Sequence, residues 1–435
     1  MENTKIHTKK SFFDLFLFNN TNTYISFYLL IISIFLEFYY VNFVHKIYFY
    51  DGFSFDFNIV KYVISKFLLI GFLLLSHMLY DKSKFVYSIY SIFMLFVLIP
   101  NLILYSYMNV TEGPILVSSF ILLLLVFISA NKLSVSHIYV QENIKYYFLV
   151  LAAILFLIPI AIENGFTVNW KTLFLQEIYE TRDVFASKLS SLSSYTFGWE
   201  VKVVAPLLLI FCLIKKEYFF AFLAFSFVIY SFLISGHKSV YLSTVVILFF
   251  FYLGKNYELK IKYFFALIIF MLIGVYAFDS TFLEGNLTQS IFVRRLFFVP
   301  ALLNTHYFDF FQNEPIYLSH SILSSFIEYP YDLDPSHLIA NEYFAKPEMS
   351  SNNGIIADGY MNFGIIGAIL YSFIFSIVIL FFNSLDIDSR YFGLFFLLIR
   401  VFIGSALLTV VLTHGLWILL LLSLVYLRKR KLMNT

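Results

Sequence analysis

Charged residues and cysteine are the two classes that this sequence uses least. Only 13% of its 435 residues are charged, whereas 60% are hydrophobic. A soluble chain is usually about a quarter charged and about half apolar, so this composition favours lipid over water as the solvent of the folded chain. The single cysteine, Cys212, excludes an intrachain disulfide, a paired-cysteine metal site and a dithiol redox centre.

The sequence also lacks the common signatures of nucleotide and hydrolytic chemistry. It has no P-loop, no H-E-x-x-H, no G-x-S-x-G and no G-x-G-x-x-G before a strand–helix unit. These absences weigh against ATP-driven transport and against zinc or serine hydrolysis. A net charge of +2 gives no large basic field, so we expect no nucleic-acid partner.

Long apolar runs are what the sequence has in abundance. A membrane-spanning helix needs about 20 mostly apolar residues, and the runs predict an all-α integral membrane protein of about 12 spans. The tail 391–427 is too long for one span, and Thr413-His414-Gly415 offers a turn that divides it into two. The other ten predicted spans are 24–43, 59–80, 85–105, 114–130, 146–162, 197–214, 218–234, 240–254, 263–278 and 359–382.

The distribution of lysine and arginine predicts the orientation. Basic residues concentrate in the connections that are cytoplasmic if the N-terminus is cytoplasmic, which places both termini inside. The N-terminal lysines precede the first apolar run without a small-residue cleavage site, so we expect no cleaved signal peptide. We divide the chain into three parts. Residues 1–278 form a membrane bundle of about nine helices with an outer loop at 163–196. Residues 279–358 form a large outer loop, and residues 359–435 form the C-terminal helices and a basic tail.

Some lysines and arginines lie outside the predicted cytoplasmic connections, and they predict an anion site on the outer face. Arginine forks bind phosphate oxygens and stabilise a departing diphosphate, and we assign diphosphate binding to Arg182, Lys238, Arg294, Arg295 and Arg400. We interpret 291–300 as an interfacial helix lying in the plane of the membrane. Anchoring to lipid headgroups is the alternative role for its two arginines, and an ion pair with Glu180 or Asp183 is the alternative for Arg182.

The second part of the large loop has a composition typical of sugar binding. Carboxylates bond sugar hydroxyls and aromatic rings stack on apolar sugar faces, and we assign these roles to Glu328, Tyr329, Asp332 and Tyr360. His337 or Asp358 is the predicted general base for an attacking hydroxyl. Capping of the following helix is an equally good explanation of Asp358.

In their order and placement, several short segments resemble the Wzy-type O-antigen polymerases, also called oligosaccharide repeat unit polymerases. The resemblance covers most of the chain through its topology. The segments are Ile178-Tyr179-Glu180-Thr181-Arg182, Ser235-Gly236-His237-Lys238-Ser239, Arg294-Arg295 with Pro300, Tyr307-Phe308-x-Phe310-Phe311, Asn352-Asn353-Gly354-x-x-x-Asp358-Gly359-Tyr360-Met361-Asn362-Phe363-Gly364, and Thr413-His414-Gly415.

The resemblance implies a metal-independent membrane glycosyltransferase similar to the C class, without a cofactor. Such proteins use undecaprenyl-diphosphate-linked oligosaccharides on the outer face of the inner membrane. They transfer the growing chain from its lipid carrier to the incoming unit, making O-antigen or capsular polysaccharide. The family's outer-loop arginines correspond to Arg182, Arg294 and Arg295. Membrane lipid, a chain-length regulator and a flippase are the further partners that the resemblance implies.

Three other functions stay open at this point. An O-antigen ligase shares a multi-span body, a large outer loop and arginine–histidine chemistry, and differs in its acceptor. A repeat-unit flippase also has about a dozen spans, but the long loop at 279–358 disfavours it. A non-enzymatic scaffold is disfavoured because outer-face charges are costly without a partner.

Overall fold

The computed structural model describes residues 20–136, 138, 140–165, 167–174, 176–282 and 285–427. Every regular element in these residues is a helix. The first half of the chain forms α2 (Asn20–Tyr39), η1 (Tyr40–Val44), α3 (His45–Ile47), η2 (Phe49–Asp51), α4 (Ile59–Lys82), α5 (Lys84–Phe93), η3 (Met94–Leu98), α6 (Ile99–Tyr107), α7 (Gly113–Ile128), α8 (Glu142–Asn164), η4 (Trp170–Phe174), α9 (Ile178–Lys188), α10 (Ser191–Trp199) and η5 (Glu200–Val204).

The second half continues in the same way, with a break inside its longest helix. α18 is interrupted at Phe363 and Gly364, whose backbone angles are not helical. The elements are α11 (Ala205–Lys215), α12 (Tyr218–Ser235), α13 (Lys238–Tyr252), α14 (Tyr257–Phe282), α15 (Leu287–Gln289), η6 (Ser290–Phe298), α16 (Val299–Phe310), α17 (Pro335–Phe344), α18 (Ile355–Ser384), η7 (Ser389–Tyr391), α19 (Phe392–Gly404), α20 (Leu407–Val411) and α21 (Leu416–Tyr426).

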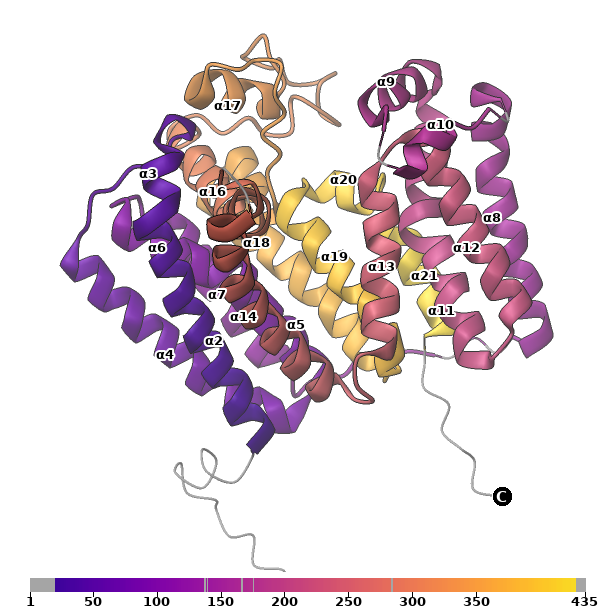
Figure 1. The fold of residues 1–435 in the computed structure, drawn as a ribbon, viewed down its shortest axis with the longest axis horizontal. Coiled ribbons are helices and arrows are strands. Elements are labelled where there is room, and N and C mark those ends of the chain that lie inside the picture. The colour runs from indigo at the N-terminus through magenta and orange to yellow at the C-terminus, as the bar shows by residue number, and fades with distance from the viewer. Residues whose placement is uncertain are drawn as a thin grey trace, which may run out of the picture.

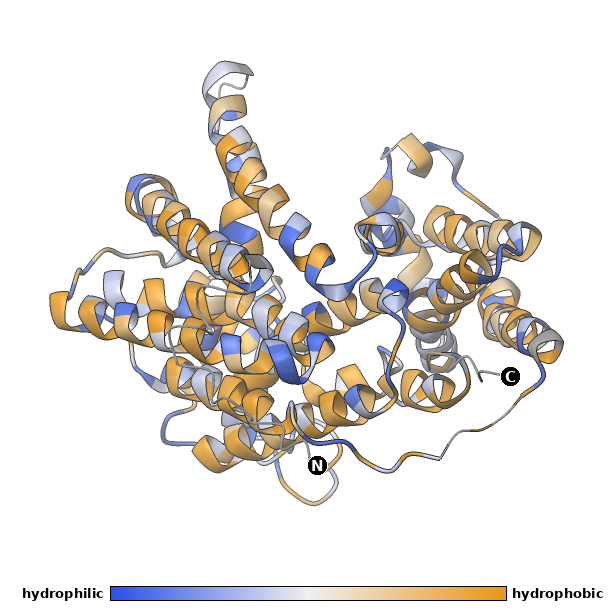
Figure 2. Cartoon of the chain, turned by 90° about the horizontal axis from the view of Figure 1, so that it is seen from below, coloured by the Kyte–Doolittle hydropathy of each residue, from blue (hydrophilic) through white to orange (hydrophobic). Residues whose placement is uncertain are grey.

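Eight helices are long and apolar enough to cross a membrane, which is compatible with an integral membrane protein. Apolar residues predominate along the helices (Figure 2), and many of them are exposed: Phe67, Phe222 and Phe270 are among the most exposed side chains. Lipid is the solvent in which such faces are stable. The eight are Thr21–Ile47, Ile59–Lys82, Lys84–Tyr107, Ile144–Asn164, Ser191–Lys215, Tyr218–Ser235, Tyr257–Thr281 and Ile355–Ser384.

The helices form two groups joined by α13 and α19. In Figure 1, α2, α4 to α7, α14 and α18 lie on one side and α8 to α12 with α21 on the other. Lys84–Tyr107 is enclosed by other helices along its whole apolar window, as expected for a helix that is hydrophobic all round. One large core runs through both groups, and a smaller core lies among α8 to α13.

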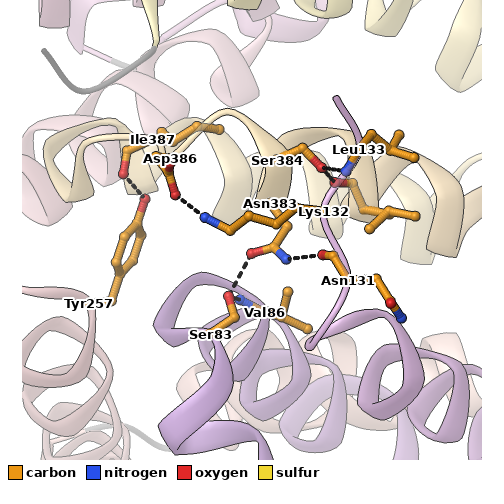
Figure 3. A network of polar contacts seen from close by, with 11 residues as sticks. Ser83, Val86, Asn131, Lys132, Leu133, Tyr257, Asn383, Ser384, Asp386 and Ile387 are labelled. Carbon is orange, nitrogen blue, oxygen red and sulfur yellow. Dashed lines mark hydrogen bonds and ion pairs between the residues drawn. The ribbon is translucent and has the colours of Figure 1, made fainter. Parts of the chain in front are cut away.

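Loops that are distant in sequence gather at two opposite ends of the bundle. At the lower end in Figure 1, Asn383 contacts both Ser83 and the carbonyl of Asn131, and Lys132 pairs with Asp386 (Figure 3). Tyr257 donates to the Ile387 carbonyl in the same network. These are connections for which the sequence predicts one common side. The upper end carries α9, α17 and α20 (Figure 1).

The long stretch 279–358 is more structured than a loop. α14 extends to Phe282, and η6 with α16 forms a continuous helix whose Val293, Phe297 and Phe298 are buried in the main core. Ile291, Phe292 and Arg295 on the same helix are exposed. The segment that the sequence predicts as an interfacial helix is therefore packed into the bundle by one of its faces.

Candidate cationic site

Three helices of the bundle change from π-helical to α-helical winding just before a proline. η3, η5 and η6 each end two residues before a proline, namely Pro100, Pro206 and Pro300. A proline ring clashes with the carbonyl four residues earlier and offers it no N–H. A π-helical turn, in which hydrogen bonds span five residues, relieves this conflict. The widened turn in η5 carries Glu200 and Lys202.

α9 packs against the turn between α12 and α13, and this contact brings Arg182 close to Lys238. Gly236 ends α12 at φ +62°, and a Cβ there would lie 2.6 Å from the carbonyl oxygen of Ile178. Arg182 Nη2 donates to the Gly236 carbonyl at 3.4 Å. The Arg182 Cζ and the Lys238 Nζ lie 5.5 and 5.7 Å from the centroid of the Tyr179 ring. Two of the predicted cations thus share one aromatic platform.

Lys202 extends from η5 to the turn before α21. A Cβ on Gly198 would lie 2.3 Å from the Thr413 carbonyl oxygen, so glycine permits this close approach. Lys202 Nζ is hydrogen-bonded to Nδ1 of His414. The other ring nitrogen of His414, Nε2, lies 3.0 Å from the Ser405 hydroxyl.

These side chains line a cavity of about 340 Å³ between η5, α13, α19 and α21. We call it the cationic cavity, because Lys202, Arg400 and His414 are among its lining residues and no carboxylate is. Its remaining polar lining residues are serines. The apolar walls are Val201, Val203, Val240, Leu394, Leu397, Leu398, Val401, Leu416 and Leu419.

Arg400 also lines this cavity, and one of its nitrogens lacks a hydrogen-bond partner among the described residues. Its Nη1 is buried and has no hydrogen-bond partner in the described part of the chain. Its Cζ lies 4.8 Å from the centroid of the Phe96 ring. A buried donor without a partner is costly, and an anion in the cavity would provide one.

Two histidines lie in the positive field of this region. Burial, followed by the charges of Arg182 and Lys202, lowers the pKa of His237 to about 4. Burial, followed by the charge of Lys202, lowers the pKa of His414 to about 3. Lys202 therefore links the Arg182–Lys238 pair to the cationic cavity electrostatically, and both imidazoles are neutral at neutral pH.

Arg294 and Arg295 lie on η6 and are not among the residues that line the cationic cavity. Arg294 Nη1 is 2.6 Å from Asp51 Oδ2, and its Cζ lies 4.3 Å from the Tyr48 ring centroid. Its Nε and Nη2 also contact the Ser290 hydroxyl. Arg294 is thus neutralised by a carboxylate, which makes it a poorer diphosphate ligand than the sequence predicts. Arg295 is exposed.

The two predicted bases have different surroundings. His337 lies on α17, and its Nδ1 is 2.8 Å from the Pro347 carbonyl. That nitrogen must carry the proton, which leaves Nε2 as an acceptor. Asp358 is 2% exposed, and its two oxygens accept hydrogen bonds from the Leu407 N–H and from Asn362 Nδ2, at 2.6 and 3.0 Å. Asp358 therefore caps the start of α20 rather than the start of its own helix.

The predicted sugar ligands are divided between solvent and core. Glu328 and Asp332 are exposed, and Tyr329 donates to the Leu333 carbonyl at 2.8 Å. Tyr360 stacks on Phe308 at 3.8 Å between centroids, so one of its faces is covered. α17, which follows Glu328 to Asp332 in the chain, lies on the other side of the upper end from α9 in Figure 1. The structure thus places Arg182 and Lys238 on one aromatic ring and Arg400 in the cationic cavity, which neither Arg182 nor Lys238 lines.

Lys202, His414 and Glu200 are the residues that we did not assign from the sequence. The sequence carries a signal for two of them, because Lys202 and Glu200 both fall within the predicted span 197–214, where ionisable side chains are rare. Glu200 is fully buried, and neither carboxyl oxygen has a hydrogen-bond partner in the described ranges. No three His, Cys, Asp or Glu side chains of these ranges are grouped to hold a metal ion.

Comparisons with family models, with characterised proteins and with solved structures give no match to this chain.

Proposed function

We propose that this protein polymerises undecaprenyl-diphosphate-linked oligosaccharide repeat units by glycosyl transfer on the outer face of the inner membrane. The observation that carries the proposal is the cationic cavity. Lys202 and Arg400 line it without a carboxylate, and Arg400 keeps a buried N–H unpaired. Such a cavity suits an anion with several acceptor oxygens, and a diphosphate has this chemistry.

The walls of the cavity support a diphosphate that is attached to a lipid. Leu394, Leu398 and Leu419 are among its apolar lining residues. A polyprenyl diphosphate combines an apolar tail with a charged head, so both parts of the cavity would be used. Departure of the diphosphate places negative charge beside Arg400 and Lys202, where fixed cations stabilise the transition state.

The proposal includes a membrane topology. The four shorter apolar helices Gly113–Ile128, Lys238–Tyr252, Phe392–Gly404 and Leu416–Tyr426 would join the eight long ones, giving about 12 spans. The lower end, where Lys132 and Asp386 pair, would face the cytoplasm with both termini. The upper end, with α9 and α17, would face outward, where α17 and Glu328 to Asp332 would receive sugar.

The experiment that tests this function is a gel of surface polysaccharide from cells that lack the gene. A polymerase predicts loss of the ladder, with a single repeat left on the acceptor. A polymer that stays on its lipid carrier would indicate a ligase, and complete loss of repeats would indicate a flippase. An unchanged ladder would contradict all three functions.

A further inference from the structure

Lys202 differs from Lys66 and Lys260, two other lysines on helices of the bundle, in the group that holds its ammonium. Lys66 pairs with Glu37, and Lys260 donates to backbone carbonyls at the end of α13, among them Leu253 and Gly254. Lys202 is held by a histidine ring, His414. A carboxylate neutralises the lysine that it holds, whereas a neutral imidazole fixes the ammonium and leaves its charge available.

The hydrogen bonds define which nitrogen of His414 carries the proton. Lys202 Nζ lies closer to Nδ1 of His414 than to Nε2, which is 3.3 Å away. An ammonium only donates, so Nδ1, the nearer nitrogen, presents its lone pair to Lys202. Nε2 then carries the proton and donates to the Ser405 hydroxyl, 3.0 Å away. Burial and the nearby Lys202 lower the pKa of His414 to about 3, which agrees with a neutral ring.

We propose that His414, anchored by Ser405, is a positioning residue that aims the Lys202 ammonium at the diphosphate of a substrate in the cationic cavity. The identity of that substrate rests on the proposed function. All three residues line the cavity together with Arg400. His414 takes one of the three N–H donors of Lys202 and leaves the others for the anion. A lysine side chain is flexible, and holding it in place before binding reduces the entropy that binding would otherwise cost.

A double-mutant cycle tests this relation in the purified full-length protein in lipid nanodiscs. The probe is radiolabelled inorganic pyrophosphate, and equilibrium dialysis gives its dissociation constant. Lys202→Met removes the cation and is expected to weaken binding about 10- to 100-fold, the effect of losing a charged hydrogen bond. His414→Leu is expected to weaken binding about 3- to 10-fold, because the ammonium is present but no longer fixed.

The decisive result is the double variant. If His414 acts through Lys202, the double variant binds pyrophosphate no more weakly than the Lys202→Met variant. The two dissociation constants should then agree within about twofold. His414→Gln keeps an acceptor for the ammonium and an N–H for Ser405, and is expected to restore binding. A merely structural role of the ring would not give this coupling or this rescue.

Three results would overturn the proposal. The two substitutions could weaken pyrophosphate binding additively, His414→Gln could bind pyrophosphate as weakly as His414→Leu, or the wild-type protein could bind no pyrophosphate. Unfolding temperatures within a few degrees of wild type verify that each variant is folded. Coupled binding together with an unchanged polysaccharide ladder would support the Lys202–His414 relation and contradict the polymerase, so the two failures are distinguishable.

Discussion

At the scale of single residues, the distinction that matters is between a paired cation and an unpaired one. Arg294 and Arg295 are neighbours in sequence, and the sequence assigns both to the diphosphate. In the structure Arg294 is 2.6 Å from Asp51, whereas Arg400 in the cationic cavity has a buried N–H without a partner among the described residues. Pairing depends on a loop 243 residues away along the chain, which a local pattern does not reveal.

Arg294→Ala is expected to act on stability, because it leaves the partly buried carboxylate of Asp51 without its nearest cation. We expect a loss of about 1–3 kcal/mol, measured as a lower unfolding temperature in detergent. Arg295→Ala is the matched control and should leave that temperature unchanged. Equal unfolding temperatures for the two variants would contradict a structural role of Arg294.

The buried histidines predict the direction of a pH effect on stability. Burial, with nearby cations, lowers the pKa of His237 to about 4, and burial lowers that of His306 to about 4, against about 6.5 in an unfolded chain. The unfolded state therefore binds more protons between these values, and stability falls as the pH drops from about 6.5 to about 4. Thermal unfolding across this range should show the decrease, and His237→Gln should reduce it. If His237→Gln leaves the dependence of the unfolding temperature on pH unchanged, His237 does not cause the effect.

At the scale of elements, the wide turns before prolines explain how charged side chains reach the interior. Apolar runs predict where helices occur, but they do not predict that η5 is π-helical or that α18 breaks at Phe363 and Gly364. Pro206 and Gly364 are visible in the sequence, but it does not show how the chain packs around them. Near the break in α18, for example, a Cβ added to Gly367 would lie 2.1 Å from the Gly359 carbonyl oxygen. The position of Lys202 follows from this winding.

Pro206→Ala is expected to let η5 wind as an α-helix. Loss of the widened turn would rotate the preceding residues by about 100° and separate Lys202 from His414. We expect polymer synthesis to fall about 10-fold while the protein stays folded, measured from the polysaccharide ladder at matched protein levels. Pro159→Ala in α8 is the control, because this proline also lies inside a helix but has no place in the cavity lining. Full activity of Pro206→Ala would contradict this reading of η5.

At the scale of the whole molecule, the sequence predicts the helical class and most helix positions well. The ten expected spans outside the tail depend only on runs of apolar residues, which lipid solvation makes reliable. Of the predicted site residues, Arg182 and Lys238 share the Tyr179 ring and Arg400 lines the cationic cavity, whereas His337 lies on α17 and Asp358 caps α20. Sequence analysis does not show which loops meet at one end, because the contacts of Gly198 with Thr413 and of Gly236 with Ile178 are tertiary.

The single buried cysteine makes the proposed topology directly measurable. Cys212 is buried, and Cys212→Ala provides a background without thiols. Ser350 and Ser134 are exposed in connections at the proposed outer and cytoplasmic faces. A membrane-impermeant maleimide should label Ser350→Cys in intact cells and Ser134→Cys only after the inner membrane is opened. The reverse pattern would contradict the orientation.

The most direct test of the central claim is complementation of the gene-deleted strain with Arg400→Met, read from the polysaccharide ladder. Arg390→Met is the matched control, since this arginine pairs with Asp388 at the lower end, 2.7 Å away. At equal protein levels in the membrane, we predict that Arg400→Met leaves only single repeats, whereas Arg390→Met restores the ladder. A full ladder from Arg400→Met would contradict the assignment of the cationic cavity as the site of polymerisation.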